Sequence, residues 1–142
     1  MAFLTKDELK TVADQNIINK LVNLDDTIVE EIIEESISLM KSYLSRYYDA
    51  EAIFATAGSK RNKHVLKKLK DIVIYEIYER HTRETNDVAA RRYNIAMHWL
   101  EKINTGEQGD GTLPSKPDEP GEEDGTSGDT RYGGNKRYTS IY

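Results

Sequence analysis

The chain has 142 residues, a formal net charge of −5 and no cysteine. This length accommodates one domain, and the lack of cysteine excludes disulfide bonds, thiolate metal sites and cysteine nucleophiles. The N-terminus has no apolar signal-peptide core and no run approaches the roughly 18 to 20 apolar residues that span a bilayer, so we expect a soluble protein that is not secreted.

Two short elements are predicted at the N-terminus. Thr5 and Glu8 have the spacing of a capping box, in which each side chain accepts a hydrogen bond from the other's backbone N–H, so a first helix should run to about Ala13. Residues 16–24 place apolar positions between polar ones, as in a short helical turn. The Asp25–Asp26 pair should cap the next helix, because carboxylates accept the unpaired N–H groups at a helix start.

The strongest helical pattern covers residues 26–47. One apolar row recurs every three or four positions and should face the core: Val29, Ile33, Ile37, Met40 and Leu44. A second row lies beside it: Ile28, Ile32, Leu39 and Tyr43. Together the rows cover nearly half of the circumference, more than a helix with one buried face needs. We interpret the second row as a candidate subunit contact, with core packing of both rows as the equal alternative.

Residues 48–62 lose the helical pattern, so we predict a connecting loop in which Ile53 and Phe54 plug the core. A helix resumes over residues 63–83. Its core stripe consists of six apolar residues: Val65, Leu66, Leu69, Ile72, Val73 and Ile77. Two apolar residues on its far side are further candidates for subunit contact: Ile74 and Tyr78.

A last long helix is predicted to begin at Asn86 or Asp87, either of which can cap it, and to end before Gly106, a residue type that terminates helices. Its inner face should consist of Val88, Ala89, Tyr93, Ala96, Trp99, Leu100 and Ile103. The fold class is therefore all-α, a small helical bundle of three long helices plus a short N-terminal helix, with an extended C-terminal tail. This helical domain covers residues 1–105.

The chain changes character at Gly106, because all three prolines and eight of the nine glycines lie there or beyond. We predict an acidic Gly/Pro-rich linker over residues 106–130 and a basic, tyrosine-rich docking strand over residues 131–142. Eight acidic residues and one lysine give residues 107–130 a charge of −7, and the last twelve residues carry +3, so about −1 remains for the body. The expected docking residues are Arg131, Tyr132, Arg137, Tyr138, Ile141 and Tyr142.

No set of residues in the sequence converges on a reaction. His64, His81 and His98 lack the spacing of helical metal ligands, and the sequence has neither a phosphate-binding glycine loop nor a nucleophile elbow. The carboxylate pairs Glu30–Glu31 and Glu34–Glu35 point away from the apolar stripe, as on a solvated face. We therefore expect no enzyme activity, no metal and no cofactor.

Charged residues also occur on the apolar stripes. Glu76 and Arg80 are four residues apart in the middle of a core stripe, and Arg92 lies on the inner face of the last helix. Because buried charges are costly unless paired, we predict that these three form an internal or interface ion network.

A basic cluster precedes and opens the helix over residues 63–83: Lys60, Arg61, Lys63, Lys67, Lys68 and Lys70. Positive charge at a helix start opposes the helix dipole, so an acidic group should lie opposite. The linker of a neighbouring subunit, another assembly component or nucleic-acid phosphate could each supply this acidic group. The alternative is a cluster that is only solvated.

A family resemblance rests on residues of the last helix and of the end of the 26–47 helix. The order Ser42-Tyr43-Leu44, Arg46-Tyr47, a long helix, then Arg92-Tyr93 with Ala96, Trp99-Leu100 and Gly106 resembles the Mu-like phage and prophage head-tail connector, or adaptor, proteins. The likeness covers about residues 5–106. The ending Arg131-Tyr132-Gly133-Gly134 and Arg137-Tyr138-Thr139 is similar to the family's glycine-then-arginine finish.

The resemblance implies a structural subunit of the virion that forms a ring between the portal and the tail. Its implied partners are copies of itself in a cyclic homo-oligomer, a dodecamer, together with the portal protein and tail or further connector proteins. DNA would touch it only in passage, and no membrane is involved. The alternative is a small helical DNA-binding module that uses the Lys60–Lys70 cluster, which would bind DNA with strong salt dependence.

Overall fold

The computed structural model describes residues 2–23, 25–81 and 86–116 of the chain. The helices in chain order are η1 (Lys6–Thr11), α1 (Gln15–Leu21), α2 (Asp26–Leu44), α3 (Ala50–Phe54), η2 (Gly58–Lys60), α4 (Lys63–His81) and α5 (Asp87–Thr105). Within these ranges the only β pairing is one isolated bridge, between Tyr48 and Ser115. The all-α prediction with three long helices is confirmed. No helix of the described part is both long enough and apolar enough to cross a membrane.

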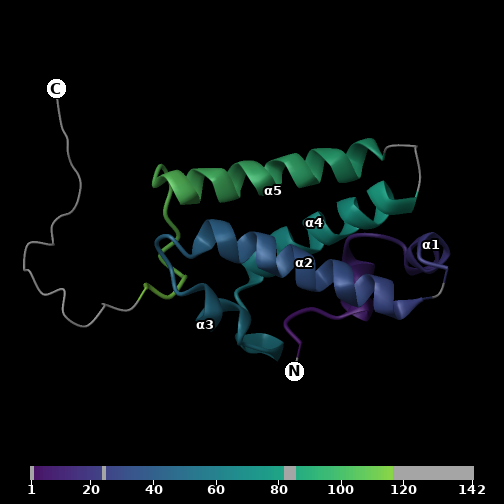
Figure 1. The fold of residues 1–142 in the computed structure, drawn as a ribbon, viewed down its shortest axis with the longest axis horizontal. Coiled ribbons are helices and arrows are strands. Elements are labelled where there is room, and N and C mark those ends of the chain that lie inside the picture. Colours follow the sequence, from purple (N-terminus) through teal and green to yellow (C-terminus); the bar gives the residue numbers. More distant parts are fainter. Residues whose placement is uncertain (1, 24, 82–85, 117–142) are drawn as a thin grey trace, which may run out of the picture.

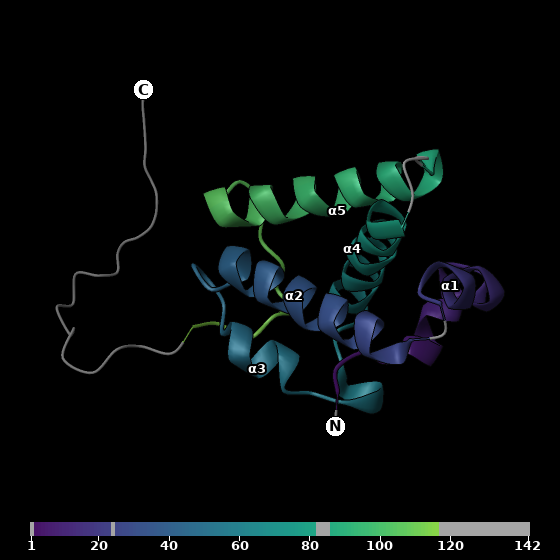
Figure 2. The same ribbon diagram turned by 45° about the vertical axis from the view of Figure 1, so that its right-hand side comes forward.

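The long helices α2, α4 and α5 pack against one another and form the core (Figure 1). In both views, α3 and the N-terminal segment lie on the side of α2 that faces away from α5 (Figures 1 and 2). Helix α2 is therefore covered on two sides. The largest fully buried side chains come from every layer and include Leu9, Ile18, Met40, Leu44, Leu69, Ile72, Ile77, Leu100 and Ile103.

The predicted ends of the long helices hold with small shifts. Asp25 Oδ1 accepts the N–H of Thr27 at 3.1 Å, and Asn86 Oδ1 accepts the N–H of Ala89 at 2.9 Å, so both are the N-caps. Helix α5 ends at Thr105 and is followed by Gly106, whose φ of 84° is left-handed. Helix α2 ends at Leu44, three residues before the predicted end.

The N-terminal region differs from the prediction in detail. Glu8 Oε1 accepts the backbone N–H of Thr5 at 3.1 Å, as the predicted capping box requires. The helix that follows is a 3-10 helix and ends at Thr11, because a segment this short favours the tighter i to i+3 hydrogen bonds. Asp14 then caps α1 by accepting the N–H of Asn16 at 2.8 Å.

The prediction of a plain loop over residues 48–62 is wrong, because this range contains α3 and η2. Asp49 Oδ1 accepts the N–H of Ala52 at 3.1 Å and so caps α3. A helix of five residues is too short to show a helical period in the sequence. Ile53 and Phe54 are buried, as predicted for the core plug.

Residues that follow the predicted domain boundary at residue 105 pack against the helices. Residues 107–115 fold back onto the turn between α2 and α3, where Tyr48 Oη accepts the N–H of Asp110 at 2.9 Å. The N–H of Asp49 donates to the carbonyl of Pro114 at 2.9 Å, and Leu113 is only 6% exposed. A single leucine among polar residues gives no periodic signal, so the sequence assigned this segment to the linker.

Candidate functional site

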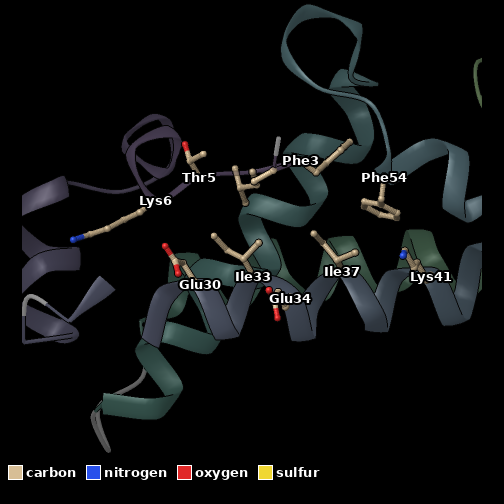
Figure 3. Close-up of a pocket in the computed structure, with 11 residues that line it drawn as sticks. Phe3, Thr5, Lys6, Glu30, Ile33, Glu34, Ile37, Lys41 and Phe54 are labelled. Atoms are coloured by element: carbon tan, nitrogen blue, oxygen red, sulfur yellow. The ribbon is translucent and has the colours of Figure 1, made fainter. Parts of the chain in front are cut away.

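A groove of about 520 Å³ lies between the N-terminal segment and α2 (Figure 3). Its floor is apolar, because Ile33 and Ile37 point from α2 toward Phe3 and Phe54. The rings of Phe3 and Phe54 meet edge to face, with centroids 4.9 Å apart. An apolar floor with charged residues at its edge suits an amphipathic peptide segment.

The N-terminal wall of the groove is held in place by Arg61. The Nη1 group of Arg61 donates to the carbonyl oxygen of Phe3 at 2.7 Å and to Glu8 Oε1 at 3.0 Å, and Nη2 donates to Glu8 Oε2 at 2.7 Å. Hydrogen bonding to Arg61 is the largest of the effects that lower the pKa of Glu8 to about 2. The sequence placed Arg61 in the basic cluster and gave no sign of this contact.

The unbalanced charge of the groove is negative. Four charged side chains line it: Lys6, Glu30, Glu34 and Lys41. Each lysine is paired, the first with Asp26 and the second with Glu51 at 3.1 Å. Among the residues that the structure describes, neither of the two glutamates has an ion-pair partner.

The carboxylate pairs of α2 are exposed, as expected for a solvated face. The helical period nevertheless divides them, because Glu30 and Glu34 line the groove whereas Glu31 and Glu35 do not. The two sets therefore supply equal charge on the same helix in different surroundings.

The outer face of α5 carries a second hollow, of about 610 Å³. It is lined by Asp87, Ala90, Arg91, Asn94, Ile95 and His98. Ile95 is 53% exposed, and Val88, two turns earlier on the helix, is 43% exposed. The prediction that Val88 faces inward is wrong, because this residue lies at the edge of the face on which Ala89 and Ala96 are buried as predicted. This face presents apolar surface that the described part of the chain does not cover.

The residues predicted as subunit contacts serve mainly in the chain's own core. Ile32 and Ile74 are buried, with 8% and 5% exposure. The other four are partly buried against the core: Ile28, Leu39, Tyr43 and Tyr78. Because other segments of the same chain cover α2 on two sides, both of its apolar rows pack against the core of the domain. Core packing of both rows is the alternative that the sequence left open. The role of these six residues in contacts between subunits stays a prediction.

The internal form of the predicted ion network does not occur among the described residues, and the interface form stays a prediction. Within the described ranges, no ion pair joins Glu76, Arg80 or Arg92 to one another. Arg80 is exposed, since it lies near the C-terminal end of α4, and Arg92 Nη1 donates to the carbonyl of Val12 at 3.2 Å. Glu76 is half-buried. Burial is the main cause that raises its pKa, and the nearby carboxylates of Glu79 and Glu35 raise it further.

The basic cluster over residues 60–70 is divided among contacts within the chain. Besides the Arg61 contacts, Lys67 Nζ lies 2.9 Å from Asp71 Oδ2, and Lys70 Nζ donates to Thr11 Oγ1 at 3.0 Å. Lys60 and Lys63 are exposed, and Lys68 is half-buried. The acidic groups expected opposite this cluster thus include residues of the same chain.

His64 and His98, two of the three histidines, lie in different parts of the structure. The ring of His64 lies 4.9 Å from that of Trp99, and His64 Nδ1 is 3.7 Å from Asp110 Oδ2. His98 is exposed at the α5 hollow, and the side chain of His81 is not among those described. Over the described ranges, no three histidine, cysteine or acidic side chains lie close enough together to hold a metal ion.

The remaining predicted contacts, Arg131, Tyr132, Arg137, Tyr138, Ile141 and Tyr142, lie outside the described residues. Comparison with known proteins gives one finding: residues 1–128 match the family model described as "Bacteriophage Mu, Gp36". No curated protein and no solved structure matches the chain. The family match covers every helix of the domain and the segment that folds back onto it.

Proposed function

The chain belongs to the bacteriophage Mu Gp36 family, and we propose that it is a structural head-tail connector, or adaptor, subunit of a tailed bacteriophage. Its copies form a ring between the portal and the tail of the virion. The partners in this proposal are other copies in a cyclic homo-oligomer, taken as a dodecamer, the portal protein, and tail or further connector proteins. DNA contacts the ring only in passage.

The observation that carries this proposal, beyond the family match, is the exposed apolar face of α5. Val88 and Ile95 lie on this face beside the hollow and are left exposed by the residues that the structure describes. A cyclic ring needs two different contact faces on each subunit, because each copy meets one neighbour on either side. Ile17 on α1 and Tyr47 after α2 are further exposed large apolar side chains and supply candidates for the second face.

The test measures the mass of the assembly formed by the full chain, alone and with purified portal rings. Ile95→Asp places a charge in the proposed contact and should abolish ring formation while circular dichroism shows unchanged helix content. Ser38→Asp introduces the same charge at an exposed position on α2 and should assemble normally. Normal rings from Ile95→Asp would exclude α5 as a subunit contact, and failure of the parent chain to assemble even on portal rings would refute the connector function.

The alternative function is a DNA-binding module that uses the Lys60–Lys70 cluster. The structure gives it less support than the sequence did, because Arg61 and Lys67 are paired with carboxylates of the same chain. Fluorescence anisotropy with labelled duplex DNA at low salt tests this alternative directly. Binding that weakens steeply with salt, and that weakens further in Lys60→Ala/Lys63→Ala, would favour it over the connector role.

A further inference from the structure

We propose that the groove between the N-terminal segment and α2 binds the C-terminal segment of this chain, residues 131–142. The groove is preformed, since Arg61 fixes the backbone of Phe3 on one side and α2 forms the other. The inference concerns an interaction surface of the chain and does not depend on the proposed connector role.

The apolar chemistry of the two parts matches. Aromatic and branched aliphatic side chains build the floor of the groove, where Phe3 and Phe54 face Ile33 and Ile37 (Figure 3). Ile37 is half-buried and the other three are more deeply buried, so the groove presents only the edges of these side chains to an incoming segment. The C-terminal segment has four large side chains of the same kind: Tyr132, Tyr138, Ile141 and Tyr142. Tyrosine is suited to such a site because it buries a large apolar ring while its hydroxyl stays at the wet edge.

The charges also match, and they select this segment over the one before it. Glu30 and Glu34 carry the unbalanced negative charge of the groove. Residues 131–142 carry three basic side chains and no acidic one, whereas residues 117–130 carry six acidic side chains and no basic one. Electrostatic complementarity therefore favours the C-terminal segment and rejects the acidic stretch that leads to it.

The chain leaves the described domain beside the groove. The bridge between Tyr48 and Ser115 fixes the exit, and Lys116 lines a hollow together with Lys41. Lys41 also lines the groove, so the two features are adjacent. The 15 residue steps from Lys116 to Arg131 span at most roughly 50 Å, which makes the groove accessible to the segment of the same chain and to that of a neighbouring copy.

Disulfide trapping in the full chain tests this inference, and the lack of native cysteine makes the readout clean. Ala2→Cys lies at the groove and Ser140→Cys within the C-terminal segment, and the two should form a disulfide under mild oxidation. The control pairs Ser140→Cys with Glu79→Cys, an exposed position on α4 away from the groove and from the proposed ring contact. We expect roughly tenfold faster trapping at the groove, because docking raises the effective concentration of the two thiols. A gel distinguishes trapping within one chain from trapping between two, and either product supports the inference.

A charge reversal gives the second arm. Glu30→Lys/Glu34→Lys should lower the trapping rate severalfold, whereas Glu31→Lys/Glu35→Lys, with the same charge change on the same helix, should leave it near the parent value. All four positions are exposed, so the helix content of both variants should equal that of the parent. Equal trapping at Ala2→Cys and Glu79→Cys, or equal loss in both charge variants, would overturn the inference. Neither arm requires a ring or a portal, so the result is independent of the connector proposal.

Discussion

Arg61 and Glu8 form a two-pronged ion pair between residues that are 53 positions apart in the sequence. The Nη1 to Oε1 distance is 3.0 Å and the Nη2 to Oε2 distance is 2.7 Å. Through the same guanidinium, the segment before α4 also holds the carbonyl of Phe3. One side chain thus binds both Phe3 and Glu8 of the N-terminal segment, which forms a wall of the groove.

This pair predicts a specific loss of stability in acid. The pKa of Glu8 is lowered from 4.5 to about 2, so the folded state binds fewer protons than the unfolded state between these values. The contribution is complete above about pH 4.5 and is lost as the pH falls through 2. Because the Glu8 side chain is 32% exposed, solvent screening limits the contribution of this ionisation to the free energy of unfolding to about 1 to 2 kcal/mol.

Urea unfolding at a series of pH values checks this prediction. Glu8→Gln should be less stable than the parent at pH 7, and the gap should close toward pH 2 as the parent carboxylate becomes protonated. Subtracting the two curves cancels the other carboxylates. A gap that stays constant across this range would show that the pair contributes nothing through ionisation.

The geometry of Arg61 matters as well as its charge. Arg61→Lys keeps the charge but cannot reach Phe3 and both oxygens of Glu8 at once, so we expect a loss of about 1 to 2 kcal/mol in the free energy of unfolding. Lys60→Arg, the reverse change at an exposed neighbouring position, should alter it by less than about 0.5 kcal/mol. Equal stability of the two variants would mean that charge alone accounts for the contact.

The long helices were predictable from the sequence because their information is local. Residue types next to apolar periods predict helix starts at the pairs Asp25–Asp26 and Asn86–Asp87 and a stop at Gly106, and the structure shows that the first member of each pair is the cap. What could not be predicted depends on contacts between distant segments. The hydrogen bond between Tyr48 and Asp110 joins positions 62 apart, and no local pattern marks either residue as a partner of the other.

The candidate surfaces were harder to predict for a related reason. The excess of apolar residues on α2 was visible, but the sequence could not show that the N-terminal segment and α3 cover part of that surface. Glu30 and Glu34 were correctly expected to be exposed. Their place in a groove follows only from the position of Phe3, which belongs to no periodic element. Exposure was thus predictable, while the shape around it was not.

Gly106 should be intolerant of a side chain for two separable reasons. Its φ of 84° costs an alanine about 1 kcal/mol, and a Cβ there would lie 3.1 Å from the hydroxyl of Tyr47. Gly58 has a similar φ of 62° but open space around it, so Gly58→Ala should show the backbone cost alone. In urea unfolding, Gly106→Ala should lose more stability than Gly58→Ala, and Tyr47→Phe should recover part of the difference. Equal losses at both glycines would exclude a role for the Tyr47 contact.

Leu113 decides whether the segment that folds back belongs to the domain. Its side chain is 6% exposed, so Leu113→Ala should lower the free energy of unfolding by about 2 to 3 kcal/mol through lost burial and the cavity that remains. Ile95→Ala removes a similar apolar volume from an exposed site and should change the stability of the monomer by less than about 0.5 kcal/mol. Both are measured by urea unfolding at a concentration where sedimentation shows a monomer. If the two variants unfold alike, residues 107–115 contribute no packing, and the domain ends near residue 105 as the composition of the chain indicates.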